Sequence, residues 1–158
     1  MEYIINHVPV RNKKRTRRKM VPEYITIHST GNPNASARSE RAYLTNPQNQ
    51  SVTSYHIVVD DKESIEVTPL DEVAYHAGDG SRGTGNTKSI GIEISEYGNR
   101  QKAIENAVQV TASLLVEFGW RVDRIKQHYD WSGKNCPRIL RTGNLWQKFI
   151  EDVRKEVE

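Results

Sequence analysis

The chain has 158 residues, of which 35% are hydrophobic and 27% are charged, and its formal net charge is +3. This length and composition predict one globular domain of ordinary size and exclude an intrinsically disordered chain. No apolar stretch approaches the roughly 20 residues that cross a bilayer, so we expect no membrane span.

The first 20 residues form a basic lead-in. Seven basic residues and no acidic residue lie between Arg11 and Lys19. Such a run could bind a polyanion, either nucleic acid or a phosphate polymer of a cell wall. We favour a solvated, partly mobile segment, and we expect a monomer that does not bind nucleic acid. The start lacks the apolar region of a secretory signal, which predicts a cytoplasmic chain.

The first predicted strand covers residues 24–28. Ile25 and Ile27 share one face of this strand, which puts His28 on the other face. A helix is predicted over residues 36–44, after a loop rich in turn-forming residues. Residues 51–70 contain two strand candidates joined by the polar turn DDKE, a pattern typical of a hairpin.

A glycine-rich loop and three regular elements make up the second half. Residues 71–89 form a long loop that begins the glycine-rich stretch, a feature that is more often functional than filler. Residues 89–95 predict a strand, and residues 101–118 predict a helix that Gly119 ends. A last helix is predicted over residues 144–157. The interleaved strands and helices predict a single α/β domain, with a central mixed β-sheet flanked by helices.

Three side chains have the chemistry of a catalytic zinc site. Cys136 is the only cysteine, so it cannot close an intrachain disulfide, and His128 lies eight residues before it. His28 could join them at the end of its strand. Two histidines and one thiolate suit one zinc ion with an open coordination position for water. A packed histidine remains the ordinary alternative for any one of these positions.

Two charged residues stand out near these candidate ligands. Glu93 interrupts the apolar strand SIGIEIS, and burial there would raise its pKa toward the range of a general base. The alternative is a strand with one polar face toward solvent. Lys134 could place a cation near a developing oxyanion, although most loop lysines are merely solvated. Trp131, between the last two candidate ligands, could stack on sugars.

Five ordered segments resemble one known family over nearly the whole chain. The segments YITIHST, SVTSYHIVVD, VAYHAG, NTKSIGIEIS and QHYDWSGKNCP look like those of the zinc-dependent N-acetylmuramoyl-L-alanine amidases. This family includes amidase-type phage lysozymes and the peptidoglycan recognition proteins. The likeness is greatest to the catalytic domains of phage or prophage endolysins of Gram-positive rods. The resemblance implies a zinc amidase catalytic domain over residues 1–158. Such endolysins usually carry a separate cell-wall-binding domain as well, and we expect none within these residues.

The resemblance also implies roles for individual residues. Zinc ligands are implied at the matching positions, which are His28, His128 and Cys136. Glu93 matches the glutamate that some members use as general base. Tyr55 and Lys134 match residues that polarise or stabilise the reacting carbonyl. His76 in AYHAG matches a histidine that lines the substrate groove, a role that we interpret as substrate binding.

The function implied is a peptidoglycan hydrolase. Zinc-activated water would cleave the amide bond between N-acetylmuramic acid and L-alanine, and the enzyme would reach the wall during phage lysis. Three alternatives remain open: a peptidoglycan-binding module of the same fold without catalysis, a cytosolic amidase that recycles soluble muropeptides, and a cysteine hydrolase that uses Cys136 as nucleophile.

Overall fold

One mixed sheet organises the chain in the computed structural model, which describes residues 1–158. Its order is β1-β4-β3-β5-β2-β6. The strands are β1 (Glu2–Ile5), β2 (Tyr24–Ser29), β3 (Ile57–Val59), β4 (Glu63–Glu66), β5 (Ser89–Ile94) and β6 (Ile125–Gln127). Neighbouring strands run parallel except β3 and β4, which form the predicted hairpin. The predicted α/β fold with a central mixed sheet is confirmed.

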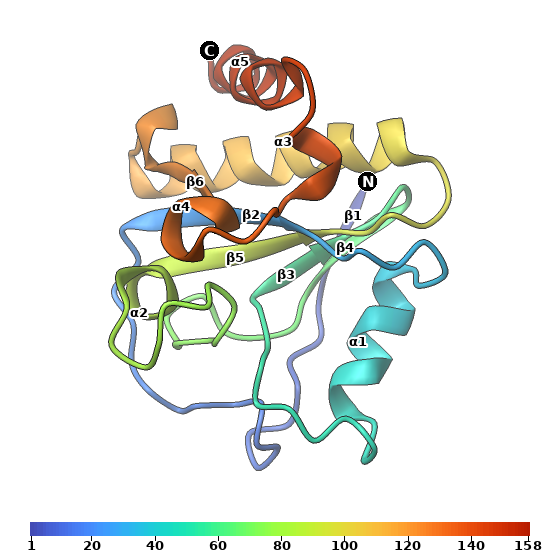
Figure 1. The fold of residues 1–158 in the computed structure, drawn as a ribbon, viewed down its shortest axis with the longest axis vertical. Coiled ribbons are helices and arrows are strands. Elements are labelled where there is room, and N and C mark those ends of the chain that lie inside the picture. The colour runs from blue at the N-terminus through green and yellow to red at the C-terminus, as the bar shows by residue number, and fades with distance from the viewer.

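Helices cover both faces of this sheet (Figure 1). They are α1 (Ala37–Thr45), α2 (Thr84–Lys88), α3 (Arg100–Phe118), α4 (His128–Ser132) and α5 (Leu145–Val157). The long α3 lies along one face and α5 packs outside it, whereas α1 and α2 lie on the opposite side. None of the helices is both long and apolar enough to cross a membrane.

The main core lies between the sheet and α3. Ile25 and Ile27 of β2 are paired in register with Ile90 and Ile92 of β5, and all four are fully buried. Burying one such side chain stabilises the fold by about 1.5–3 kcal/mol. The isoleucine face of β2 is thus held against the core, as its alternation predicts, and His28 is turned to the other face.

The ends of the long helices follow their sequence signals in part. The Asn99 side chain accepts a hydrogen bond from the Lys102 N–H at the start of α3, and Gly119 ends that helix in the left-handed conformation at φ +70°. Asn144 occupies the predicted cap position of α5, but its side chain makes no capping hydrogen bond. α5 is therefore stabilised by the packing of its apolar face and not by a side-chain cap.

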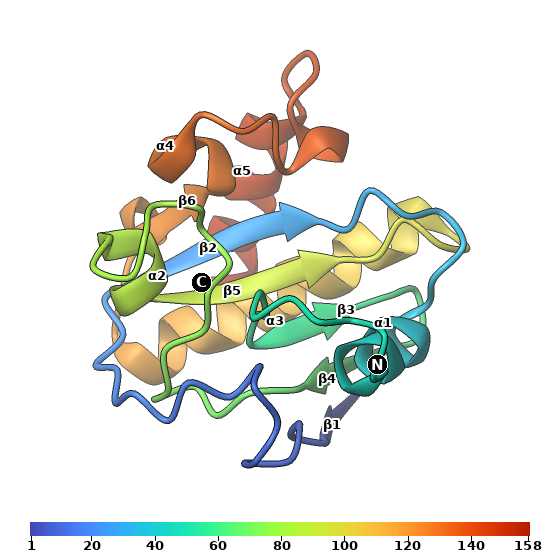
Figure 2. The same cartoon turned by 60° about the horizontal axis from the view of Figure 1, so that its bottom comes forward.

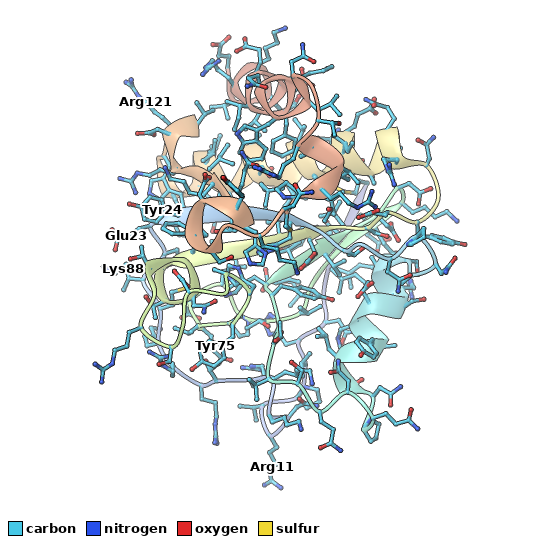
Figure 3. The ribbon with its side chains drawn as sticks, in the orientation of Figure 1. Arg11, Glu23, Tyr24, Tyr75, Lys88 and Arg121 are labelled. Carbon is cyan, nitrogen blue, oxygen red and sulfur yellow. The ribbon has the colours of Figure 1, made fainter.

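The basic lead-in differs from the solvated, partly mobile segment that we predicted. Residues 2–5 form strand β1, which pairs with β4. Lys14 is only 1% exposed, and its Nζ donates to the Asn49 carbonyl at 2.7 Å. Arg15 donates twice to the Glu72 carboxylate, at 2.7 and 3.0 Å. The prediction was wrong for Lys14 and Arg15, whose partners are distant in the sequence, but the other five basic residues of the run are exposed, as predicted. Arg11, for example, extends away from the body of the protein (Figure 3).

Candidate functional site

The candidate site lies at the carboxyl ends of two parallel strands. In the register of β2 and β5, His28 is the partner of Glu93. Figure 2 shows the two strands side by side with their arrowheads at the same edge of the sheet. Ligand and catalytic groups gather at such edges in α/β folds because loops leave the sheet there. The strand pairing alone thus puts an imidazole and a carboxylate together.

Three predicted metal ligands converge at this edge. One nitrogen or sulfur atom from each of His28, His128 and Cys136 lies within 4.8 Å of the others. The His28 Nδ1 and His128 Nδ1 atoms are 3.1 Å apart, and Cys136 Sγ lies 3.7 Å from His28 Nδ1. All three residues are buried. The arrangement is a cluster of soft and borderline donors that could hold one divalent metal ion.

Local hydrogen bonds set the positions of His128 and Cys136. His128 is the first residue of α4, directly after β6, which pairs with β2. The Asp130 carboxylate accepts from the Gln127 N–H at the start of this helix. The chain then turns back, and the Tyr129 N–H donates to the Cys136 carbonyl at 3.1 Å. The short helix and its loop therefore form one closed unit that carries two donors.

A buried carboxylate ties this unit to the rest of the site. The Glu96 side chain is fully buried just after β5, and it accepts hydrogen bonds from Arg138 and Arg100. Its second oxygen accepts from the Gly31 N–H at 2.8 Å, in the loop that follows β2. Glu96 thereby joins the loop after His28 to the loop after Cys136. No feature of the sequence had marked it.

Glu93 lies beside the cluster with an unused oxygen. Its Oε2 is 4.0 Å from His28 Nδ1, its side chain is 18% exposed, and its buried Oε1 has no hydrogen-bond partner. Burial, together with the negative charge of Glu40, raises the pKa of Glu93 to about 8. A carboxyl group in this environment can accept and return a proton near neutral pH.

Tyr55 and Lys134 border the same region in different ways. Tyr55 precedes β3 and is 7% exposed, and its buried hydroxyl has no hydrogen-bond partner. Burial raises the pKa of Tyr55 well above 10, so it stays a neutral donor. Lys134 is exposed, and its positive charge helps to lower the pKa values of His28 and His128, after the larger effect of burial. Lys134 is thus accessible from solvent, whereas the Tyr55 hydroxyl is buried without a partner.

The two predicted substrate-binding residues are held by the protein itself. His76 is 5% exposed, and its ring nitrogens lie 2.9 Å from His28 Nε2 and 3.2 Å from the Ser89 carbonyl oxygen. The half-buried Trp131 donates its indole N–H to Thr26 Oγ1 at 2.9 Å. Both ring nitrogens of His76 are thus used inside the protein, whereas part of the Trp131 ring remains exposed.

His56 extends the buried histidine cluster on the far side of His76. The two rings meet edge to face, with centroids 5.6 Å apart. His56 Nε2 donates to the Glu72 carbonyl at 2.7 Å, and its Nδ1 accepts from the Gly91 N–H at 2.9 Å. His56 is therefore a packed residue just before β3. His7 Nε2, in the basic lead-in, lies 2.7 Å from the Glu66 carboxylate.

Replacing His56 with Gln is expected to make the free energy of unfolding less dependent on pH in the acidic range. Burial lowers the pKa of His56 to about 4, against about 6.5 in an unfolded chain. Between these values the unfolded state binds more protons, so stability falls as the pH drops from 6.5 to 4. The loss is on the order of 3 kcal/mol.

Urea unfolding at several pH values checks this expectation. His56→Gln keeps an acceptor for Gly91 and a donor for Glu72, and the difference between the two proteins isolates one titrating group. The slope of the unfolding free energy against pH is proportional to the number of protons taken up on unfolding. Between pH 6.5 and 4 this number should be smaller by about one in the variant. Equal slopes would mean that His56 is not kept neutral by the fold.

The chain matches a known protein family over most of its length. A family model described as N-acetylmuramoyl-L-alanine amidase matches residues 17–139. The N-acetylmuramoyl-L-alanine amidase CwlA of Bacillus subtilis (strain 168) is 51% identical over 143 residues, which are 88% of this chain and 52% of that protein. The chain spans about half the length of the curated relatives it matches.

Two solved structures match almost the entire chain. The catalytic domain of XlyA superposes with a TM-score of 0.90 at 38% identity, covering 97% of this chain and 99% of that chain. A mutant endolysin from Bacillus subtilis gives a TM-score of 0.90 at 39% identity, with the same coverage. At these identities the likeness extends beyond the fold to the sequence.

Proposed function

This chain belongs to the N-acetylmuramoyl-L-alanine amidase family, and from that premise we propose that it hydrolyses the amide bond between N-acetylmuramic acid and L-alanine in peptidoglycan. The convergence of His28, His128 and Cys136 beside Glu93 is the observation that carries the proposal. Residues 1–158 act as one catalytic domain, which the near-complete match to a solved catalytic domain supports.

Zinc is the metal that the donor set fits. In a tetrahedral zinc site, bond lengths of about 2.0–2.1 Å to nitrogen and about 2.3 Å to sulfur place neighbouring donors about 3.3–3.6 Å apart. The separations of His28 from His128 and from Cys136, 3.1 and 3.7 Å, lie close to these edges, and the donors of His128 and Cys136 lie within 4.8 Å of each other. Three protein donors also leave a fourth position open, as catalytic zinc sites require. When bound, zinc would supply a Lewis acid and hydroxide at neutral pH.

Glu93 acts as the general base and then as the general acid. Its free Oε1 and raised pKa of about 8 suit a group that takes a proton from water and returns it to the leaving amine. The peptide nitrogen must be protonated before the amide bond can break. Glu93 is the carboxyl group placed against the metal ligands, so this step is assigned to it.

Lys134 and Tyr55 stabilise the oxyanion that forms from the amide carbonyl. The free ammonium of Lys134 and the unpaired hydroxyl of Tyr55 are donors that would find an acceptor when the carbonyl oxygen becomes negative. Trp131 remains a candidate for contact with the glycan through the exposed part of its ring. The protein acts as a monomer that reaches the wall during phage lysis.

Two rival functions use the same residues differently. A non-catalytic binding module would need no cluster of three metal donors, and here all three are present. A cysteine hydrolase needs a thiol with a lowered pKa. Burial instead raises the pKa of the Cys136 thiol to about 11. The cluster thus favours a metal enzyme over both.

Metal removal tests the proposal on the wild-type protein. We expect a strong chelator to abolish cleavage of purified cell walls, and added zinc to restore it. Mass spectrometry of the products should show free N-terminal alanine on the released stem peptides. Cleavage that survives complete metal removal would overturn the zinc mechanism. Activity on soluble muropeptides but not on intact walls would instead support the recycling amidase.

A further inference from the structure

His76 has hydrogen-bond partners that define which of its nitrogens carries the proton. Its Nε2 lies 3.2 Å from the Ser89 carbonyl oxygen, which can only accept. His76 is buried and has no carboxylate within hydrogen-bonding distance. The ring is therefore neutral, with its single proton on Nε2.

The proton on His76 in turn determines the form of His28. Because His76 Nδ1 has no proton, it must accept across the 2.9 Å contact with His28 Nε2. His28 Nε2 is then the donor, and His28 Nδ1 keeps a free lone pair. That lone pair faces His128 Nδ1 at 3.1 Å and Cys136 Sγ at 3.7 Å. The chain from Ser89 through His76 thus directs the lone pair of His28 into the cluster.

The glycine-rich loop and α2 hold His76 in this place. The side-chain oxygen of Asn86 accepts from the N–H groups of both His76 and Ala77, at 2.8 and 2.7 Å. A β-carbon at Gly91 of β5 would lie 2.8 Å from the His76 ring, so only glycine leaves room for the imidazole there. Two separate features of the fold therefore accommodate one buried ring.

We propose that His76 is a positioning residue that selects the tautomer of His28 in which Nδ1 is free to bind the metal. This inference rests on the proposed function for the identity of the metal. Metal-bound histidines commonly donate their other N–H to a carboxylate or a backbone carbonyl. Here a second imidazole lies between the ligand and the carbonyl. His76 therefore acts through His28 and does not line the substrate groove.

The wild-type protein without metal provides the first test. Long-range ¹H–¹⁵N correlation spectra of histidine rings distinguish a protonated nitrogen from a bare one. We expect His28 and His76 both to carry the proton on Nε2 and to have a bare Nδ1. A proton on His28 Nδ1 would overturn the proposal, and this measurement requires no variant to fold.

Two substitutions at His76 provide the second test. His76→Leu removes the acceptor, so the His28 spectrum should show a mixture of tautomers and zinc affinity should fall about 10–100-fold. His76→Gln retains a side-chain oxygen that can accept from His28, and both readouts should recover in part. A leucine variant with the wild-type tautomer and the wild-type zinc affinity would contradict the proposal.

A core variant separates positioning from general loss of stability. Val153 is fully buried on α5, so Val153→Ala should lower the melting temperature and leave the His28 spectrum and zinc affinity unchanged. If the wild-type protein binds no zinc, the proposed function fails, while the metal-free spectrum still decides the role of His76. The two failures are thus distinguishable.

Discussion

Cys136→Ser is expected to lose zinc and nearly all wall hydrolysis. Cys136 supplies the only donor of the cluster that can become an anion, because the other two donors are neutral imidazoles. A serine hydroxyl stays protonated at neutral pH and is a poor zinc ligand. The loss of zinc affinity should exceed the roughly 10–100-fold that loss of an outer partner costs. Zinc content after dialysis and the rate of wall clearing measure both effects.

Ile139→Val is a matched control close to Cys136, in the short 3-10 helix Arg138–Leu140. Ile139 lies three residues beyond Cys136 and is 6% exposed. Removing one methyl group should cost about 0.5–1.5 kcal/mol of stability and leave zinc bound. A serine variant that retains both zinc and hydrolysis would contradict the assignment of Cys136 as a ligand, and with it the metal site as we describe it.

Glu93→Gln is expected to keep zinc and lose turnover by about 10²–10⁴-fold, the usual contribution of a general base. Glutamine has the size of glutamate, and the Glu93 carboxylate lies 4.0 Å from His28 Nδ1 without belonging to the donor cluster. The amide, however, cannot take a proton from water. Single-turnover rates, read beside zinc content, separate a lost base from a lost metal.

The same variant has a second readout in stability. Because burial disfavours the ionised form of Glu93, replacing it with a neutral amide should make the metal-free protein more stable. Glu40→Gln is a control for the loss of a buried carboxyl on α1 outside the cluster, with the added effect that removing its charge should make the pKa of Glu93 less raised. We expect less than about a tenfold change in its turnover. Wild-type turnover in Glu93→Gln would reject its role as base.

The elements with strong periodicity could be predicted from the sequence. The alternation of Ile25 and Ile27 and the apolar stripe of α3 reflect burial on one face, which local spacing records directly. The edge strands β1 and β6, with four and three residues, were not predicted. Such short strands carry too few residues for a pattern, and only their pairing with β4 and β2 makes them strands.

The predicted site was recognisable for a similar reason. Several site residues are unusual for their place in the sequence and can be recognised from it alone. They are His28, Glu93 and Cys136. The role of Glu96 depends on Arg138 and Gly31, which lie 42 and 65 residues away. The contact of His76 with His28 spans 48 residues. Support of this kind is a property of the folded arrangement, so residue type and spacing could not reveal it.

The three donors are far apart along the chain, so a metal ion bound between them would also stabilise the folded protein. His28 is separated by 100 residues from His128 and by 108 from Cys136. An ion bound by all three residues would connect β2 to the last third of the chain. At a free concentration 100 times its dissociation constant, such an ion adds about 2.7 kcal/mol to the folded state. In a cell with little free zinc, the same protein would unfold more often and would be degraded sooner by proteases.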